Sequence, residues 1–272
     1  MSATQSPIYL APFDGIADRY DEVFTSSRIG RAQRASVWKE LEKTFHAGDH
    51  VLEVGCGTGV DACFLAARGV HVLACDSSPR MIAVAASRVK ERQLANLVLP
   101  RLMAAEEIAS LRTRRLFDGA CSNFGALNCV PDIGRLARDL ATLLRPGAAA
   151  LLCWMGPCCL WEILWYLAQA KPGKALRRLR RGGVTARLND GAPVHVYYPS
   201  VRSLARTFAP EFSLKSIKGV GVAVPPSYLE PIANRFPSLL GAAVFADFLL
   251  GRCPGIRVLA DHVLVRLERE DV

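Results

Sequence analysis

The segment His50–Gly59, with the sequence HVLEVGCGTG, constrains the fold more than any other part of the chain. Its apolar run ends in Glu53, and glycines follow at every second position. A second apolar run, 70–75, ends at Asp76. This order predicts a strand, a glycine turn, a helix, a second strand and an acidic residue, an arrangement that places an adenosine-containing ligand at the carboxyl edge of a parallel sheet. The three glycines are Gly55, Gly57 and Gly59.

The spacing of these glycines separates two classes of nucleotide ligand. A dinucleotide site expects GxGxxG with a pyrophosphate over the helix N-terminus, but the third position of that pattern is Val60. Glu53 precedes the glycines, where a carboxylate repels a pyrophosphate and attracts a cationic ammonium. The nonapeptide VLEVGCGTG resembles motif I of the class I methyltransferases that depend on S-adenosylmethionine (SAM), in particular the small-molecule, ubiquinone/menaquinone methyltransferase-like type.

The remaining pattern fits the α/β fold that this resemblance implies. That fold is a Rossmann-like sheet of strand order 3-2-1-4-5-7-6, with an antiparallel last pair and helical cap insertions. Pro100 interrupts the expected third strand, which therefore belongs at an edge of the sheet. Gly69 is a helix stop and Pro79 a helix start. Further strands are expected at 98–103, 117–122, 148–154, 212–222 and 262–268. Helices are expected from Thr58 or Gly59 to Arg68, at 80–93 and at 133–144.

A chain of 272 residues is long enough for a sizeable core without a second domain. We therefore expect a single methyltransferase domain over 1–272. Its core would comprise about 31–154, 199–224 and 259–269, its N-terminal lid 1–30, and its substrate-cap insertions 155–198 and 225–258. Both insertions would sit at the ligand edge of the sheet.

The resemblance implies that SAM is the cofactor and assigns roles around motif I. Glu53 would act on the amino group of SAM, and Asp76 would hold the ribose. Ser77 and Met81 would lie beside the adenine, with a plain helix start and core packing as the alternative. The full set of expected cofactor-binding residues is Glu53, Gly55, Cys56, Gly57, Gly59, Asp76, Ser77, Met81, Ala105, Glu106, Asn123 and Phe124.

Two later motifs can be compared with the family, and the first departs from the family pattern. Where the family has D-A-E-E, this chain reads AAEE, and Ala104 stands in place of the aspartate. The adenine contact is then lost, made by Glu106, or replaced by backbone groups. The stretch 122–128, SNFGALN, resembles the loop under the sulfonium, where Asn123 and Phe124 are the candidates. The sequence has no N/D-P-P-Y/F motif, which argues against methylation of adenine or glutamine amides by that type of site.

The N-terminal stretch 13–21, FDGIADRYD, resembles the F/Y-D-x-x-A-x-x-Y-D helix that precedes motif I in this group. The resemblance implies a lid that folds over the cofactor. Phe13 and Tyr20 would face the positive sulfonium, because a ring face attracts a cation. For Phe13, a hydrophobic stripe that docks the lid is the alternative.

Methyl transfer from a sulfonium is an in-line displacement, so positioning alone can supply on the order of 7–11 kcal/mol. A general base is needed only for a hydroxyl or thiol acceptor. His195 is the preferred candidate base, because its unperturbed pKa suits proton transfer near neutral pH, and Tyr20 is the second. The alternative for His195 is the outer face of a β ribbon. Tyr197, Tyr198 and Glu162 are further candidates.

The aromatic and aliphatic stretch 160–167 and the apolar stretch 236–250 predict a small or lipid-like hydrophobic acceptor. A basic tract without an acid, 171–187, contributes much of the net charge of +9. Beside Trp and Tyr, this tract favours peripheral contact with an anionic membrane, with a solvated helix face as the alternative. RNA methylation ranks lower, because no RNA-binding module is recognisable. A non-catalytic SAM-fold accessory protein is the alternative to an enzyme.

Nine cysteines without a CxxC pair indicate reduced thiols and a cytoplasmic location. A metal or arsenic site is one interpretation of the grouped residues Cys153, Cys158 and Cys159. A role as small buried hydrophobic side chains is the better interpretation, so no metal is expected. Gly156 and Pro157 break the apolar run around them, so a membrane-spanning helix is not expected. The N-terminus lacks a signal pattern, so secretion is not expected either. No feature of the sequence specifies an oligomeric state.

Overall fold

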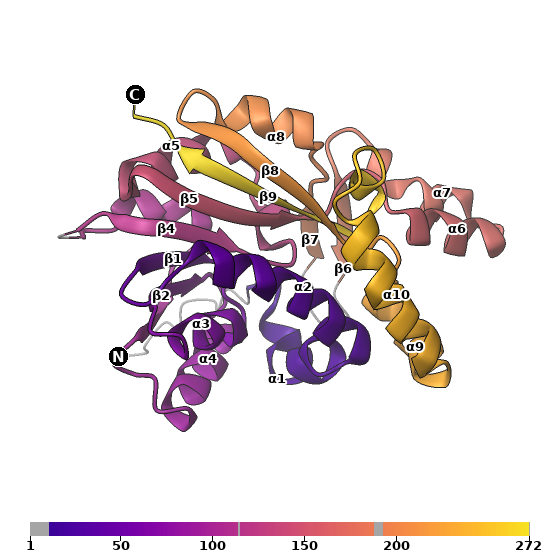
Figure 1. The fold of residues 1–272 in the computed structure, drawn as a ribbon, viewed down its shortest axis with the longest axis horizontal. Helices are drawn as coiled ribbons and strands as arrows, with labels where there is room; N and C mark the ends of the chain where they lie inside the picture. The colour runs from indigo at the N-terminus through magenta and orange to yellow at the C-terminus, as the bar shows by residue number, and fades with distance from the viewer. Residues whose placement is uncertain (1–10, 114, 188–192, 272) are drawn as a thin grey trace, which may run out of the picture.

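A seven-stranded sheet forms the centre of the computed structural model, which describes residues 11–113, 115–187 and 193–271 (Figure 1). Its order is β3-β2-β1-β4-β5-β9-β8. Neighbours from β3 to β5 run parallel, and β9 is antiparallel to both β5 and β8. The predicted fold and its antiparallel last pair are confirmed. The strands are β1 (His50–Val54), β2 (His71–Asp76), β3 (Val98–Leu102), β4 (Phe117–Ser122), β5 (Leu144–Trp154), β8 (Phe212–Val220) and β9 (His262–Arg269).

Helices cover both faces of this sheet. Three of them, α2 (Arg28–Thr44), α3 (Val60–Ala66) and α4 (Pro79–Glu91), lie on one face, where they bury one set of strand side chains. The other face is covered by α5 (Ile133–Leu143) and α8 (Val201–Phe208). A parallel sheet that is covered on both sides has strands that are apolar almost throughout, as β5 is from Ala148 onward.

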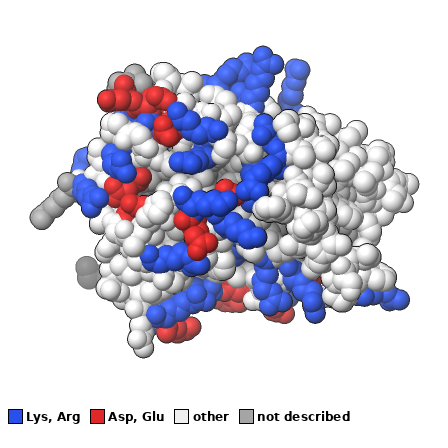
Figure 2. All heavy atoms as spheres, in the orientation of Figure 1, with Lys and Arg blue, Asp and Glu red and all other residues white. Residues whose placement is uncertain are grey.

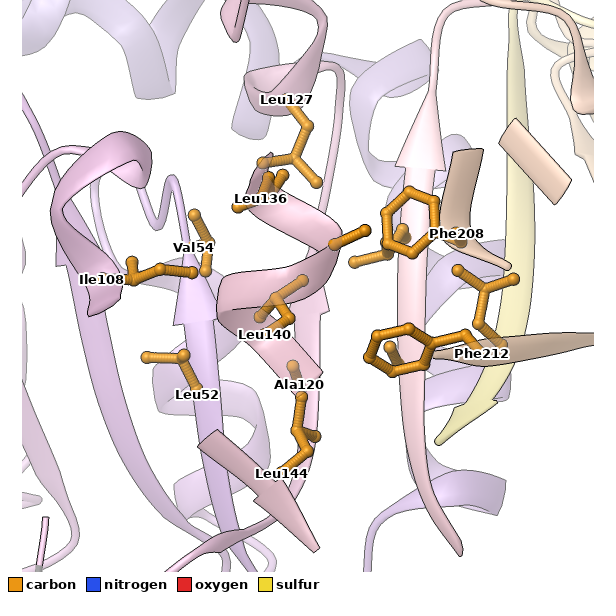
Figure 3. Packing of buried hydrophobic residues seen from close by; sticks show 14 of the residues in the cluster. Leu52, Val54, Ile108, Ala120, Leu127, Leu136, Leu140, Leu144, Phe208 and Phe212 are labelled. Carbon is orange, nitrogen blue, oxygen red and sulfur yellow. The ribbon is translucent and has the colours of Figure 1, made fainter. Parts of the chain in front are cut away.

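The larger core lies between the sheet and α5 (Figure 3). Leu136 and Leu140 of α5 pack over Leu52 of β1, and Phe208 and Phe212 close the core on the β9 side. Successive residues of β1 serve opposite cores, because strand side chains alternate between the two faces. This double burial fixes the register of β1, and with it the place where the glycine turn begins.

Several local signals in the sequence are confirmed. Pro79 occupies the first turn of α4, and the hydroxyl of Ser78 accepts a hydrogen bond from the Met81 amide at 3.1 Å. Pro100 lies in β3, which is an edge strand as predicted. Most predicted boundaries agree within two residues. The largest difference for a strand is that β5 begins at Leu144 instead of 148, because Leu144 already pairs with Phe117 of β4 before the glycine turn at Gly147.

The helices α6, α7, α9 and α10 of the two segments expected to form the cap lie at one end of the molecule (Figure 1). Trp161 and Trp165 of α6 pack with Ile29 of α2, Leu229 and Leu240 in a small third core. Of the described residues, no helix has the length and apolar character needed to cross a bilayer. The first segment comprises α6 (Leu160–Ala168), α7 (Pro172–Ala175), η5 (Arg177–Leu179), β6 (Val184–Arg187) and β7 (Pro193–Val196). The second comprises η6 (Ser227–Leu229), α9 (Glu230–Arg235), α10 (Pro237–Leu250) and η7 (Arg257–Leu259).

A buried ion-pair network attaches the first cap segment to the sheet. Arg178 donates to Glu162 at 3.0 Å and to Asp261, the residue before β9, at 2.8 Å, and the three side chains are almost completely buried. Arg177 donates to Glu162 as well, at 2.6 Å. Burial alone would raise the pKa of Asp261, but His262 and Arg178 outweigh it and hold that pKa well below its usual range.

This network corrects two expectations. The tract 171–187 is not a uniformly solvated basic face, because Arg178 is 6% exposed and is paired with acids that lie outside the tract. Glu162 is not a free base, because both of its carboxylate oxygens accept hydrogen bonds from Arg177 and Arg178. The acids were missed because Glu162 precedes the tract and Asp261 lies 83 residues after Arg178.

We expect Arg178→Gln to destabilise the protein by about 3–5 kcal/mol, because it leaves the buried carboxylates of Glu162 and Asp261 without their shared cation. Arg181→Gln is the matched control, since Arg181 is exposed in the same tract and its loss should change stability by less than about 0.5 kcal/mol. Urea unfolding followed by circular dichroism measures both values. Equal unfolding free energies for the two variants would contradict the structural role of the network.

Candidate cofactor site at the carboxyl edge of the sheet

The glycine turn after β1 is held by backbone hydrogen bonds and by one carboxylate group. The amides of Gly55 and Cys56 donate to the carbonyl of Cys75 at the end of β2. The carboxylate of Asp76 accepts from the Gly57 amide at 2.8 Å and from the Ser78 amide at 2.9 Å. Asp76 therefore fixes the turn in addition to its predicted role toward a ribose. Burial raises the pKa of Asp76, and the backbone hydrogen bonds oppose this shift.

The three motif glycines differ in the space around them, although all three have positive φ angles of 53° to 72°. A Cβ on Gly55 would lie 2.3 Å from the Cβ of Ala126, and one on Gly59 would lie 2.9 Å from the Cβ of Ala85. A Cβ on Gly57 would meet nothing within 4 Å. Gly55 and Gly59 are thus required by packing, whereas Gly57 leaves an open space above the turn.

Glu53, in β1 just before the turn, is 1% exposed, and its Oε2 atom has no hydrogen-bond partner among the described residues. Burial raises the pKa of Glu53 well above its usual range, and the negative charge of Asp61 adds to this shift. Ser122 Oγ and Asn123 Oδ1, at the end of the adjacent strand β4, are also buried without partners among these residues. Such atoms are costly unless a ligand or water completes their bonding.

Asn123 also contacts a buried ion pair that the sequence did not predict. Arg34 of α2 donates to Asp61 of α3 at 2.6 Å, and both side chains are buried. Trp38 Nε1 and Asn123 Nδ2 donate to the same carboxylate, at 2.6 and 3.0 Å. Burial would lower the pKa of Arg34, but Asp61 outweighs this effect and the pKa is raised. The available signal was an acid in the first turn of the helix after motif I.

The loop after β4 presents an aromatic ring toward the N-terminal segment. Phe124 has a φ angle of +53°, rare for a residue with a side chain. Its ring lies 5.0 Å from the ring of Phe24 and 5.6 Å from that of His262, and the Arg34 guanidinium lies 4.6 Å from its centre. The predicted candidates Asn123 and Phe124 thus both contact the Arg34–Asp61 pair. Asn128, in the same loop, joins it to the segments that follow β5 and β7 through the backbone of Met155 and Tyr197.

The N-terminal segment lies against the glycine turn and α4. It consists of η1 (Asp14–Ile16), α1 (Ala17–Tyr20) and the π-helical turn η2 (Asp21–Thr25). Asp21 accepts from the Thr58 hydroxyl of the turn at 2.8 Å and pairs with Arg88 of α4. The carboxylate of Asp14 accepts from the Ser78 hydroxyl and so reinforces the start of α4. These contacts bring the predicted lid segment to the predicted cofactor residues.

Tyr20 lies in this segment beside charged groups of the site. Burial raises its pKa to about 12, Arg34 opposes the shift, and Asp61 and Asp76 add to it. Its hydroxyl is therefore protonated at neutral pH and is poorly suited to act as a base. Phe13 is partly exposed at the start of the same segment.

The other predicted residues have mixed environments. Met81 is 2% exposed and packs in the interior, whereas Ser77 is exposed. Ala105 packs against the larger core, Glu106 is exposed, and the Ala104 amide donates to the carboxylate of Glu107. The Ala104 amide is thus already engaged, and all three alternatives for the adenine contact stay predictions: its loss, a contact with Glu106, or a contact with other backbone groups.

His195 lies on the two-stranded ribbon formed by β6 and β7, and its side chain is exposed. Its ring nitrogens face the carbonyl of Gly182 at 2.5 Å and the hydroxyl of Thr185 at 3.3 Å, and its ring contacts Tyr197. These neighbours lie in the ribbon or directly next to it in sequence. The structure therefore does not bring His195 together with the glycine turn. Burial raises the pKa of Tyr198, and Arg178 lies 5.5 Å from its ring.

A cleft of about 670 Å³ opens beside this site, between α2, α3, α4 and the N-terminal segment. It is lined in part by Arg31, Arg34, Arg88 and Arg92, and the predicted cofactor residues are not among the described residues that line it. Asp21 and Arg88, which pair with each other, both line this cleft, and Asp21 also accepts a hydrogen bond from Thr58 of the turn. Among the described residues, no group of three or more His, Cys, Asp or Glu side chains is arranged so that it could hold a metal ion.

The strand order and the glycine turn define the class I methyltransferase fold, and residues 51–147 match the family model described as a methyltransferase domain. The 2-phytyl-1,4-naphtoquinone methyltransferase of Synechococcus elongatus is 33% identical over 147 residues, which cover 52% of this chain and 60% of that protein. The demethylmenaquinone methyltransferase of Thermobifida fusca is 30% identical over 146 residues, which cover 53% and 59%. The chain thus spans about 60% of the length of these relatives.

A solved structure shows the same fold over nearly the whole chain. The CcbJ methyltransferase of Streptomyces caelestis superimposes with a TM-score of 0.62 at 19% identity, over 96% of this chain and 98% of that one. The resemblance expected from VLEVGCGTG is therefore confirmed: residues 51–147 match a methyltransferase domain, and the chain has the class I fold.

We expect Gly57→Ala and Gly59→Ala to differ in stability. Both place a side chain at positive φ, at a cost of about 1–2 kcal/mol. Only the second forces a methyl group against Ala85, which adds about 1–3 kcal/mol. Denaturant unfolding of the two variants measures the difference. A Gly59→Ala variant as stable as Gly57→Ala would show that the turn does not pack on α4 as described.

Proposed function

We propose that this chain is an enzyme that binds SAM at the carboxyl edge of β1 and β2 and transfers its methyl group to a small hydrophobic acceptor. The observation that carries the proposal is the open space above Gly57, next to buried polar atoms of Glu53, Ser122 and Asn123 that lack partners among the described residues. A ligand with an ammonium group and hydroxyl groups would complete their bonding. The match of residues 51–147 to a methyltransferase domain supports the same conclusion.

The residues of the site fit SAM group by group. Glu53 would balance the ammonium of the methionine part, and Asp76 would accept from the ribose while it still holds the Gly57 amide. Phe124 would offer a ring face to the positive end of the ligand. Bound SAM supplies an electrophilic methyl group with a neutral thioether as the leaving group. The protein then has to orient the acceptor and exclude water, for which the N-terminal segment is well placed.

For the acceptor we propose a quinone-like or similarly apolar metabolite. The two curated relatives are named for naphthoquinone and demethylmenaquinone substrates. In this chain Trp161 and Trp165 lie in the third core, between the two cap segments. Tyr20 would contribute a protonated hydroxyl as a donor, and His195 stays a prediction for the base that a hydroxyl acceptor needs. RNA methylation has no comparable support.

Transfer of a tritiated methyl group tests the catalytic part of this proposal. Purified protein with labelled SAM should label a reduced naphthoquinone that bears a short prenyl chain, and should not label transfer RNA. Trp165→Ala should lower acceptor turnover and leave SAM affinity unchanged. Binding of SAM without label transfer to this quinol or to a total lipid extract would favour a non-catalytic accessory protein instead.

We expect Gly57→Val to abolish SAM binding without unfolding the protein. The valine side chain enters the open space above the turn, where the ligand would lie. Gly147→Val is the matched control, because Gly147 also has positive φ, at 75°, and a Cβ added there would meet nothing within 4 Å, but it lies within β5, away from the turn. Calorimetric titration with SAM and with NAD measures the effect. Tight NAD binding without SAM binding would overturn the assignment.

We also expect SAM binding to release a proton. Burial and the negative charge of Asp61 raise the pKa of Glu53, and an ammonium next to its carboxyl group would lower that pKa again, because it favours the charged form. SAM affinity should therefore increase with pH until Glu53 is ionised without ligand. Titrations in two buffers of different ionisation enthalpy measure the released protons. Glu53→Gln should remove the buffer dependence, whereas Glu91→Gln, an exposed control on α4, should retain it. Identical heats in both buffers for the wild type would contradict this role.

A further inference from the structure

The second cap segment carries large apolar side chains on its outer surface. Leu239 and Phe245 of α10 are 67% and 69% exposed, and other side chains of the same helix are about half exposed. The helix is apolar on every side, because its inner face also packs on α6 and α2 through Leu240 and Ala243. A soluble surface helix is normally polar on its outer face. The other large apolar residues exposed on α10 are Val244, Phe248 and Leu249.

The only acid of α10 is turned inward. The carboxylate of Asp247 is 6% exposed and accepts from the amides of Gly221, Val222 and Ala223 at the end of β8. Asp247 thereby anchors the C-terminal part of α10 to the end of β8, and the outer face of α10 carries no negative charge. In the same way, the acid of α6 is buried, and Glu230 of α9 accepts from the Arg28 amide.

Cations border this apolar surface. Lys39 and Arg252 lie 5.8 and 5.1 Å from the ring of Phe248, and Arg235 lies 5.9 Å from the ring of Phe236. Arg252 also pairs with Glu40 of α2 at 3.0 Å, so Lys39 and Arg235 carry most of the net charge of this border. Figure 2 shows this end of the molecule as a broad surface free of Lys, Arg, Asp and Glu, with Lys and Arg along its edge. Long cationic side chains at the border of an apolar helix can reach lipid phosphates while the apolar groups enter the acyl region.

We propose that the outer face of α10, with its border of Lys39, Arg235 and Arg252, docks on an anionic lipid surface. Charge decides between this partner and a second copy of the chain. A two-fold symmetric contact through α10 would bring Lys39 and Arg235 of one molecule toward the same cations of a second copy, and α10 has no exposed acid to balance them. An anionic membrane supplies both the opposite charge and the apolar phase. The docking itself does not depend on methyl transfer. Only the suggestion that the protein takes a hydrophobic acceptor from the lipid surface rests on the proposed function.

Vesicle co-sedimentation tests this surface directly. Wild-type protein should bind vesicles of phosphatidylcholine with about 30% phosphatidylglycerol at low salt and should lose this binding at high salt. The double variant Leu239→Asp, Phe245→Asp should bind at least tenfold more weakly. Leu99→Asp is the matched control, because Leu99 is 62% exposed on β3 at the opposite edge of the sheet and its replacement should leave binding unchanged.

A second pair of variants separates charge from apolar contact. Lys39→Gln with Arg235→Gln should reduce binding to anionic vesicles severalfold, whereas Arg101→Gln on β3 should not. The proposal is overturned if the wild type ignores anionic vesicles at low salt, or if the α10 double variant binds them as well as the wild type does. It is also overturned if sedimentation velocity shows a dimer that the α10 variant dissociates, since the face then binds a second copy. Unchanged SAM binding by the α10 variants keeps each of these outcomes distinct from a failure of the proposed function.

Discussion

The ion pair between Arg34 and Asp61 connects the segments that form the candidate cofactor site. A buried pair recovers the desolvation of its charges only when further hydrogen bonds complete it, and Trp38 and Asn123 supply these bonds to the carboxylate. The same guanidinium lies against the ring of Phe124. Helix α2, the start of α3 and the loop after β4 are therefore fixed relative to one another. Glu53 lies close enough to this pair for both charges to affect its pKa.

A second buried network places the cap relative to this site. Arg178 binds Glu162 of α6 and Asp261, and the next residue, His262, packs edge-on against Phe124. One chain of contacts thus runs from the first cap segment through the start of β9 to the loop under the proposed methyl donor. This continuity gives the cap a defined position relative to the site. It also explains why a cluster of arginines that looks basic in sequence contributes structure as well as charge.

The fold was predictable because its signals are local. The glycine turn, the start of α4 at Pro79 and the edge position of β3 each follow from a few consecutive residues. The networks were not predictable, because Arg34 and Asp61 are 27 residues apart and Arg178 and Asp261 are 83 apart, and nothing in either stretch specifies its partner. The apolar stretch of α10 suggested a pocket lining, yet several of its large side chains face outward, since composition alone does not distinguish a buried helix from one with an uncovered face.

A crystal structure of the protein with S-adenosylhomocysteine, the demethylated form of SAM, tests the central claim most directly. The ribose should lie on the carboxylate of Asp76, and the amino acid part should lie over Gly57 near Glu53. The amide of Gly57 should keep its hydrogen bond to Asp76. Ligand density in the arginine-lined cleft between α2, α3 and α4, with no ligand density over the glycine turn, would contradict the proposed site and the reaction inferred from it.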